Sequence, residues 1–458
     1  MNSSPDDFFS HPDNMLILTT SPAGLGHIRV TEALRSGLDP HAHIDIVGIR
    51  NPSIQFLHRA TSQNRYLRHL MEFVQTSPLA ETQFTYLYQK HLSQHAHEVY
   101  QRISDLVKRR RPKPQTLIIV STHFSLAHQI AAIKNQLSQD LDLCIVLVVI
   151  VTDDSPSKIW AISQADFIFV PSQQTQERLN HHLTQAEPKP QVIVNPYPID
   201  RRLCQPLTEQ EYQYRQQQLH PHTPTPTQII IPISGAAVQL DYSQQLITGL
   251  ERHSQTDITV VSRESKYTTR FLNWCQDRPS VNLIANQLDR DVVADYQQAF
   301  QNQIFALEIT KPSEQTFKTL LSPRQRGGVI MLFSPPVGQQ ENDNLAFLYR
   351  HLLLPDYQDK IIIDRLFVYH ETLNINKKFL ATAQTWRGIL LPSNGPAAAT
   401  AIFRLKDSGI LSALSKFSQF PNHPELKDNG VNQFWSILAQ QTAKKCHHNL
   451  TPWKAQAP

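Results

Sequence analysis

The stretch Ser21-Pro-Ala-Gly-Leu-Gly-His-Ile-Arg-Val-Thr-Glu-Ala-Leu34 indicates the fold class of the chain. It follows an apolar run, Met15 to Thr20, and apolar residues recur at helical spacing from His27 to Leu38. This pattern predicts a strand, a tight glycine turn and a helix. Such a turn places backbone N–H groups, the positive end of a helix dipole and one imidazole at the edge of a sheet.

Two interpretations of this turn stay open from the local pattern. Gly24 and Gly26 permit close approach of a ligand or a positive φ, and His27 is the side chain best suited to proton transfer near neutral pH. The same glycines also suit an ordinary strand-to-helix turn with an incidental histidine. A short Gly-x-Gly is weak evidence for either.

The size and charge of the chain set the first limits. It has 458 residues, of which 40% are apolar, and this predicts two to three domains of about 150 residues with substantial cores. The formal net charge of +4 is small for this length, so general nucleic-acid binding is not expected.

The cysteines and the apolar runs bear on the compartment. Four widely spaced cysteines, without a Cys-x-x-Cys pair, predict neither a zinc ribbon nor a disulfide framework and favour a reducing cytoplasm. The polar, acidic start does not resemble a signal peptide. The longest strongly apolar run, Leu143 to Val151, is far shorter than the ~20 residues of a spanning helix. We expect a cytoplasmic protein whose membrane association, if any, is peripheral, on the inner face of the cell membrane.

Short apolar strands alternate with helical stretches in two series. The first series contains strands predicted at residues 15–20, 43–49, 117–121, 144–151 and 167–170, and the second contains strands predicted at 228–233, 257–261, 281–284 and 329–333. This alternation indicates βαβ units and parallel sheets. The predicted fold class is therefore α/β, with two Rossmann-like parallel-sheet domains.

The domain boundaries follow from the segment between the two series. It is Gln-rich and then rich in His, Pro and Thr, which indicates an interdomain linker. We predict an N-terminal domain at 1–204, a linker at 205–227, a C-terminal domain at 228–420, and a C-terminal helix and tail at 421–458. The last helix, Val431 to Lys445, is expected to pack back across the first domain.

Polar sequences follow three further strands of the first series: Ser121-Thr-His-Phe124, Thr152-Asp-Asp-Ser-Pro156 and Asn195-Pro-Tyr-Pro-Ile-Asp200. Sites in parallel sheets gather at the carboxyl ends of strands. Convergence of His27, His123 and either Asp153 or Asp154 would suit general acid/base chemistry. The alternative is that Asp153, Asp154 and Ser155 only cap a helix.

The segment after the second predicted strand is helical in pattern. Within residues 52–90, Arg59, Arg65 and Arg68 are interleaved with apolar and aromatic residues. Such a helix can lie on an anionic bilayer surface. An ordinary amphipathic helix on the domain is the alternative.

The chain resembles GT-B glycosyltransferases of the group that contains monogalactosyldiacylglycerol synthase and processive diacylglycerol glucosyltransferases, and more distantly the UDP-GlcNAc transferase of peptidoglycan assembly. The resemblance rests on five landmarks in the family's order, over roughly residues 15 to 350: Ser21 to Leu34; Val151-Thr-Asp153 with Trp160 and Phe169-Val-Pro-Ser172; Asn195-Pro-Tyr-Pro-Ile199; Thr310-Lys-Pro-Ser-Glu-Gln-Thr316; and Pro336-Val-Gly-Gln-Gln-Glu-Asn-Asp-Asn344.

The resemblance implies transfer of a hexose from a nucleotide diphosphate sugar, a UDP-sugar in this family, to a lipid such as diacylglycerol. The two domains would face a cleft, and the reaction would be inverting and independent of a metal or other cofactor. His27 would be the base, with Asp153 as a second catalytic residue. The implied donor-binding residues are Gly24, Gly26, Ser234, Gly235, Ala236, Thr310, Lys311, Ser313, Thr316, Gln339, Gln340 and Glu341.

The sequence departs from the family on the donor side. Ser313, Glu314 and Gln315 stand where the family has glycines or small residues, and Thr319 or Lys318 stands where it has a ribose-binding Glu. A catalytically weak or inactive GT-B protein that serves as a binding or regulatory module is therefore the alternative function. A GT-B sugar-nucleotide epimerase would share the fold, but its opening motif differs.

Overall fold

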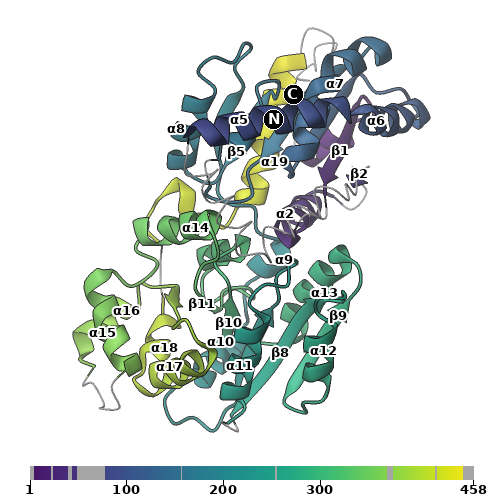
Figure 1. Ribbon diagram of the computed structural model, residues 1–458. Helices are drawn as coiled ribbons and strands as arrows, with labels where there is room; N and C mark the ends of the chain where they lie inside the picture. The colour runs from purple at the N-terminus through teal and green to yellow at the C-terminus, as the bar shows by residue number, and fades with distance from the viewer. Residues whose placement is uncertain are drawn as a thin grey trace, which may run out of the picture. The chain divides into compact units, whose positions relative to one another are not determined.

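The computed structural model describes residues 5–21, 24–39, 44–48, 78–155, 157–252, 255–368, 375–417 and 420–446 (Figure 1). The chain forms two compact units. Met1–Ala23, His27–Arg201 and Lys427–Pro458 belong to the first, and Gly24–Gly26 and Arg202–Leu426 to the second. Each unit contains one six-stranded parallel sheet. The predicted class, α/β with two Rossmann-like parallel sheets, is confirmed.

The sheet of the first unit has the order β2-β1-β3-β4-β5-β6. Its strands are β1 (Asn14–Thr20), β2 (Ile44–Gly48), β3 (Thr116–Ser121), β4 (Cys144–Ile150), β5 (Phe167–Val170) and β6 (Gln191–Val194). The helices are α1 (Pro5–Ser10), α2 (Leu25–Arg35), α5 (Pro78–Gln94), α6 (His97–Arg109), α7 (Phe124–Leu141), η1 (Lys158–Trp160), α8 (Gln173–His182), α9 (Arg201–Cys204) and α19 (Gly430–Cys446). β3 is buried at every position and β4 at all but its first, as expected for parallel strands covered by helices on both faces.

The C-terminal helix α19 belongs to the first unit, where Figure 1 shows it in yellow among blue elements. Its buried Trp435 donates from Nε1 to the carbonyl oxygen of Leu34 at 3.0 Å. Cys446 forms a disulfide with Cys144 of β4, and their Cα atoms lie 6.3 Å apart. The expectation of no disulfide is wrong here. The two cysteines are 302 residues apart, and packing of α19 rather than local spacing brings them together.

The sheet of the second unit has the order β12-β11-β10-β7-β8-β9. Its strands are β7 (Thr227–Pro232), β8 (Thr256–Arg263), β9 (Val281–Asn286), β10 (Leu307–Thr310), β11 (Ile330–Phe333) and β12 (Gly388–Leu390). The helices are α10 (Glu209–Gln218), α11 (Leu240–Leu250), α12 (Thr269–Gln276), α13 (Asp289–Asn302), η2 (Glu314–Leu320), α14 (Gln339–Arg350), α15 (Tyr357–Val368), α16 (Lys377–Ala383), α17 (Gly395–Asp407), α18 (Ile410–Leu414) and η3 (Pro424–Leu426).

Residues 205–227, predicted as a linker, contain α10 and belong to the second unit. Thr208 and Glu211 form a capping box at the start of this helix. Arg215 is buried and donates to four backbone carbonyl groups, those of Phe305, Pro323, Gln325 and Arg326. Burial lowers the pKa of Arg215 to about 9. The polar composition that suggested a linker thus serves helix capping and a buried hydrogen-bond network.

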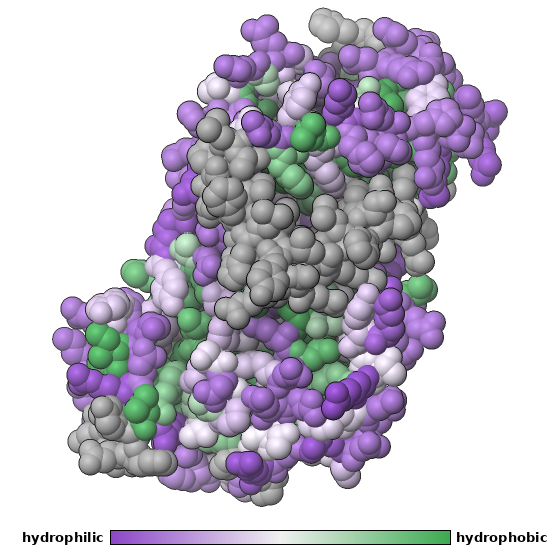
Figure 2. Space-filling model, viewed as in Figure 1, coloured by the Kyte–Doolittle hydropathy of each residue, from purple (hydrophilic) through white to green (hydrophobic). Residues whose placement is uncertain are grey.

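Some apolar side chains remain at the surface. On α5, Tyr86 and Leu87 are 64% and 65% exposed. Figure 2 shows apolar residues at the surface over α15, where Ile361 and Val368 are exposed. Within the described ranges, no helix combines the length and apolar character needed to cross a bilayer. Most of the segment predicted to lie on a membrane, residues 52–90, including its three arginines, falls outside the described residues.

Candidate functional site

The opening turn carries His27 into the first turn of α2, just after Gly24, whose φ is +155°. The His27 Nδ1 atom lies 2.7 Å from the carbonyl oxygen of Thr122 and 3.2 Å from Thr152 Oγ1. A carbonyl oxygen can only accept a hydrogen bond, so Nδ1 carries the ring proton. In the neutral ring, the basic lone pair is then on Nε2.

A set of threonines holds this ring and the backbone around it. Thr31 and Thr122 bond to each other through their hydroxyl groups at 2.8 Å. The Thr31 hydroxyl also lies 2.8 Å from the carbonyl oxygen of His27, and the Thr122 hydroxyl 3.2 Å from the same oxygen. Thr31 and Thr122 are buried, so these bonds fix the start of α2 against the end of β3. Sequence reasoning did not single out Thr31 or Thr122, although Thr31 is one helical turn after His27.

His123, the second predicted acid or base, is buried at the start of α7. Its Nδ1 atom accepts a hydrogen bond from the backbone N–H of Ser125 at 3.2 Å. The His123 ring lies 4.7 Å from the His27 ring, edge to face, and stacks on Phe124. The structure therefore brings the two histidines together, and it gives His123 a capping and packing role beside His27.

The two aspartates after β4 have different environments. Asp153 is buried, and its Oδ2 atom accepts a long, 3.4 Å hydrogen bond from Thr152 Oγ1, the hydroxyl that also contacts His27. Asp153 thus connects to the His27 ring through one hydroxyl group. Asp154 Oδ1 accepts from Thr175 at 2.8 Å and from Ser172, which caps α8. Asp154 thus bonds to the residue that caps α8 and does not itself cap a helix, whereas Asp153 is connected to the histidine.

Two aromatic side chains lie near the His27 ring, and α7 carries a further buried histidine, His128. Trp160 lies 6.2 Å from the His27 ring, measured between ring centroids, and Phe124 lies 6.4 Å from it. His128 of α7 is buried and bonds through Nε2 to the carbonyl oxygen of Ile159 at 2.8 Å. Burial lowers the pKa of His128 to about 4, so it is neutral at physiological pH. We call His27, Thr31, Thr122, His123, Thr152 and Asp153 the His27 cluster.

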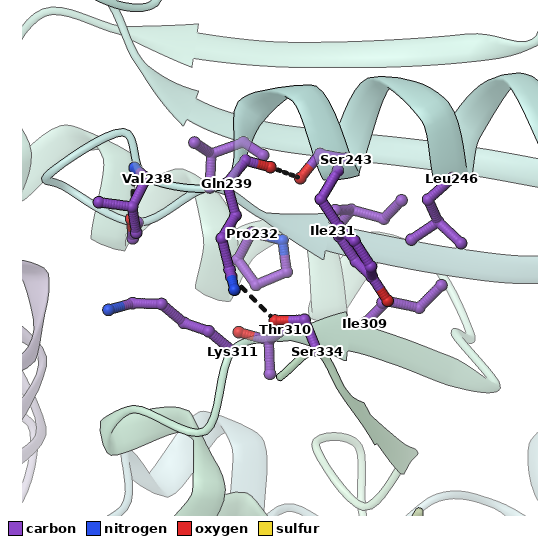
Figure 3. Close-up of a pocket in the computed structure, with 13 residues that line it drawn as sticks. Ile231, Pro232, Val238, Gln239, Ser243, Leu246, Ile309, Thr310, Lys311 and Ser334 are labelled. Carbon is purple, nitrogen blue, oxygen red and sulfur yellow. Dashed lines mark hydrogen bonds between the residues drawn. The ribbon is translucent and has the colours of Figure 1, made fainter. Parts of the chain in front are cut away.

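The second unit contains a pocket at the carboxyl ends of β7, β10 and β11 (Figure 3). It holds about 350 Å³ of space between atoms, including space open to solvent. Three of the predicted donor residues, Ser234, Thr310 and Lys311, line it. Among its lining residues Lys311 alone carries a charge, and the full lining is Ile231, Pro232, Ile233, Ser234, Val238, Gln239, Tyr242, Ser243, Leu246, Ile309, Thr310, Lys311 and Ser334. We call it the Lys311 pocket.

The turn between β7 and α11 borders this pocket. It contains the predicted donor residues Gly235 and Ala236, which are not among the lining residues. Ala237 and Gln239 both have positive φ values, +53° and +61°. Left-handed conformations of non-glycine residues cost free energy and concentrate at functional sites. Figure 3 shows Gln239 reaching from the start of α11 to Ser334; Ser334 Oγ donates to its Oε1 at 3.0 Å, and its Nε2 donates to the Pro335 carbonyl at 2.8 Å.

Lys311 forms an ion pair with Glu341, another of the predicted donor-binding residues. Glu341 is buried in the first turn of α14, and its Oε2 atom also accepts from the backbone N–H of Val337 at 2.7 Å. This carboxylate therefore binds the backbone just before its own helix and neutralises the charge of the pocket. The other two predicted residues of this segment, Gln339 and Gln340, are exposed.

The predicted donor-binding residues Ser313 and Thr316 lie at the start of a 3₁₀ helix. Residues Glu314–Leu320 form a 3₁₀ helix, η2, rather than an α-helix. The backbone N–H of Thr316 donates to the Ser313 carbonyl at 2.9 Å, and Thr316 and Thr319 are buried. Neither Ser313 nor Thr316 lines the Lys311 pocket.

A buried ion pair fixes η2 to the sheet. Lys318 donates to Glu308 of β10 at 2.5 Å and to Tyr296 of α13 at 2.6 Å. The position aligned with a ribose-binding Glu in the family is thus used for a structural ion pair, or, at Thr319, for a hydrogen bond to the Thr316 carbonyl.

Comparison with known proteins addresses the fold. No protein-family model matches the sequence, and no curated protein matches it. Similar solved structures are GT-B glycosyltransferases and UDP-GlcNAc 2-epimerases. One is MnaA of S. aureus with UDP, at 12% identity and a TM-score of 0.46, with 96% of this chain and 98% of that chain covered. Another is UGT89C1 of Arabidopsis thaliana with UDP, at 12% identity and a TM-score of 0.45, with 94% and 92% covered. A third is the UDP-GlcNAc 2-epimerase of Neisseria meningitidis bound to UDP-GlcNAc, at 9% identity and a TM-score of 0.43, with 94% and 99% covered.

Proposed function

We propose that the protein transfers a hexose from a UDP-sugar to the hydroxyl group of a lipid such as diacylglycerol. The observation that carries the proposal is the hydrogen bond between His27 Nδ1 and the Thr122 carbonyl, because it leaves the basic lone pair on Nε2. The order of the sequence landmarks supports the same reaction class. The donor would be held mainly by the second unit.

In the proposed reaction, His27 Nε2 takes the proton of the acceptor hydroxyl as its oxygen attacks the anomeric carbon. The bond between that carbon and the diphosphate oxygen breaks, and UDP leaves with inversion at the anomeric centre. Protonation makes the His27 ring positive. Buried Asp153, connected through Thr152, would stabilise that charge.

The Lys311 pocket supplies the donor side of the proposal. The Lys311 ammonium group and the backbone N–H groups at the start of α11 offer positive charge and donors to a diphosphate. α11 has no side chain capping its N-terminus in the structure, so its first N–H groups would be donors for a bound phosphate. We therefore propose that the reaction needs no metal.

A screen of UDP-sugars with diacylglycerol vesicles tests the function. Mass spectrometry of the lipid products should show a hexosylated lipid and an equal amount of released UDP. UDP-sugar hydrolysis without a lipid product would reject the lipid acceptor. If no UDP-sugar raises the melting temperature at concentrations above about 1 mM, the donor assignment is wrong.

The lipid acceptor implies contact with a membrane. Tyr86 and Leu87 on α5 lie within the predicted membrane segment and are mostly exposed. We expect their joint replacement by serine to reduce sedimentation with anionic liposomes. Replacement of Tyr357, which is 79% exposed on α15, is the matched control and should leave sedimentation unchanged. Equal loss in both variants would contradict a membrane role for α5.

The second candidate is a GT-B protein that binds a ligand without efficient turnover. The ion pair between Lys311 and Glu341 favours this function, because Glu341 already neutralises Lys311, the one charged residue that lines the pocket. Saturable UDP binding together with no transfer or hydrolysis over hours would select this function. Measurable transfer that depends on His27 would exclude it.

A further inference from the structure

We propose that His351, His423 and Glu425 form a binding site for a divalent transition-metal ion, with Zn²⁺ as the best fit. One ligand atom from each residue lies within 4.8 Å of the other two. All three belong to the second unit, with His351 at the end of α14 and Glu425 in η3. Two imidazoles and one carboxylate are a ligand set that Zn²⁺ takes in proteins, with a fourth position left for water.

The distances leave only a small adjustment for a metal. His351 Nε2 lies 2.9 Å from Glu425 Oε2, close enough to share a proton. Two ligands of a tetrahedral Zn²⁺ at ~2.0–2.1 Å are separated by about 3.3 Å. Zn²⁺ would replace the shared proton, and the two atoms would move apart by a few tenths of an ångström.

The surroundings hold the three ligands in place before a metal binds. The side chains of His351 and Glu425 are only 9% and 4% exposed. The ring of Phe347, which is fully buried, lies 4.6 Å from the His351 ring. The His423 ring lies 4.8 Å from the His351 ring. Its Nδ1 lone pair accepts a long, 3.3 Å hydrogen bond from the backbone N–H of Glu425, and this lone pair would bind the metal in place of that bond. Apolar walls and fixed ring positions favour metal affinity.

An ion pair alone does not account for the cluster. A protonated His351 beside Glu425 would be satisfied without a second imidazole, yet His423 is packed against the same ring. Two imidazoles and one carboxylate that converge from two segments of the chain can all bind one cation.

The site is separate from the proposed sugar transfer. α14 begins beside Glu341 and ends beside His351, so the two ends are about 15 Å apart along the helix axis. The metal would connect α14 to the segment containing His423 and Glu425, which lies just before the end of the second unit at Leu426. We infer a structural role. A lone His-x-Glu pattern is too common in sequences to reveal such a site.

The test uses the full chain, freed of metal with a chelator and titrated with ZnCl₂ by calorimetry. We expect one Zn²⁺ per chain, and a rise of the melting temperature by about 5 °C at 100 times the dissociation constant. His423→Gln and Glu425→Gln should each weaken Zn²⁺ binding at least 10-fold. His220→Gln, which changes an exposed histidine of the same unit, is the control and should leave binding unchanged.

Two results would overturn the proposal: no stoichiometric Zn²⁺ binding by the wild-type chain, or binding that both variants retain, which would assign it to other histidines. Melting of the metal-free variants shows whether they are folded. If they are not, the visible spectrum of Co²⁺ added to the wild-type chain decides, since a tetrahedral site with imidazole ligands gives intense bands and aqueous Co²⁺ does not.

Discussion

The His27 cluster and the Lys311 pocket both lie at the carboxyl ends of parallel strands, but they use their polar groups differently. In the His27 cluster, the Thr122 carbonyl oxygen accepts a hydrogen bond from Nδ1 of the His27 ring. The hydroxyl groups of Thr31 and Thr122 bond to each other, and that of Thr31 also donates to the His27 carbonyl oxygen. In the Lys311 pocket, Lys311 bonds to Glu341, and Gln239 bonds to Ser334. The first arrangement orients the proposed base, whereas the second already bonds the groups that a sugar donor would need.

This difference affects the cost of binding. A diphosphate that binds at the Lys311 pocket has to compete with Glu341 for the ammonium group. Glu341 is buried, and a buried carboxylate without its partner is costly. The His27 cluster needs no such exchange, because its hydrogen bonds persist while Nε2 receives a proton. We therefore expect changes at the first site to affect rate and changes at the second to affect affinity.

Replacement of His27 should have the largest effect. His27→Ala removes the proposed base, and we expect the transfer rate to fall by about 10²- to 10⁴-fold. UDP affinity, measured by calorimetry, should stay within about 2-fold of wild type, because the Lys311 pocket belongs to the other unit. His97→Ala, at an exposed position of α6, is the control. A rate that is unchanged in His27→Ala would place the base elsewhere.

The disulfide joins two residues of the first unit, so its removal should destabilise that unit. Cys446→Ser should lower the unfolding free energy of the first unit by about 4–5 kcal/mol, because the bond closes a very long loop in the unfolded chain. Thermal unfolding with and without a reducing agent measures this effect. Cys204→Ser, at a cysteine outside the disulfide, should change little. If oxidised and reduced wild type melt at the same temperature, the disulfide does not stabilise the protein.

Acid should weaken the first unit through His128. Its folded-state pKa is about 4, against 6.5 for the unfolded chain, because burial disfavours the charged ring. Above pH 6.5 both states are neutral. As the pH falls below 6.5, only the unfolded chain takes up the proton, so stability falls by about 2 kcal/mol between pH 7 and pH 5.

Urea unfolding of wild type and His128→Gln at the two pH values isolates this contribution, because other histidines titrate in both proteins. The glutamine amide can still donate to the Ile159 carbonyl, so the variant should fold. It should lose less stability on acidification than wild type does. Equal losses in the two proteins would show that His128 does not set the pH dependence.

Local patterns predicted most of the fold, and the elements they missed share a physical cause. Strands such as β4 were predicted because every residue from Cys144 to Ile150 is apolar. β6, β10 and β12 were not, because they are only four, four and three residues long. β10 also contains Glu308, a residue that strands disfavour unless a partner such as Lys318 is buried with it.

The candidate site shows a similar limit. Strand-end motifs predicted that His27, His123 and either Asp153 or Asp154 would lie near one another. The structure brings the two histidines together and connects Asp153 to His27 through Thr152. The group that sets the His27 tautomer is the Thr122 carbonyl, and a backbone acceptor has no residue signature. The pairing of Lys311 with Glu341 likewise depends on how α14 packs.

Replacement of Lys311 should weaken donor binding without affecting the His27 cluster. Lys311→Met keeps the length of the side chain and removes the charge, and we expect the dissociation constant of UDP to rise about 10-fold, or about 1.4 kcal/mol. Lys360→Met, at an exposed position of α15, is the control. Calorimetric titration with UDP measures both. An unchanged dissociation constant in Lys311→Met would place the diphosphate away from the pocket.

We expect the smallest effect on UDP binding from Glu341→Gln. This change tests directly whether the Lys311 pocket differs from the His27 cluster. This change removes the competing charge, while the amide oxygen of glutamine can still accept from the Val337 N–H. The ammonium group of Lys311 then needs no displacement, so the dissociation constant of UDP should fall by about 3- to 5-fold, with its salt dependence retained. A rise instead would mean that Glu341 positions Lys311 for the donor. The pair would then be a preorganised part of the donor site, as the threonines are for His27, and the two sheet edges would follow one design.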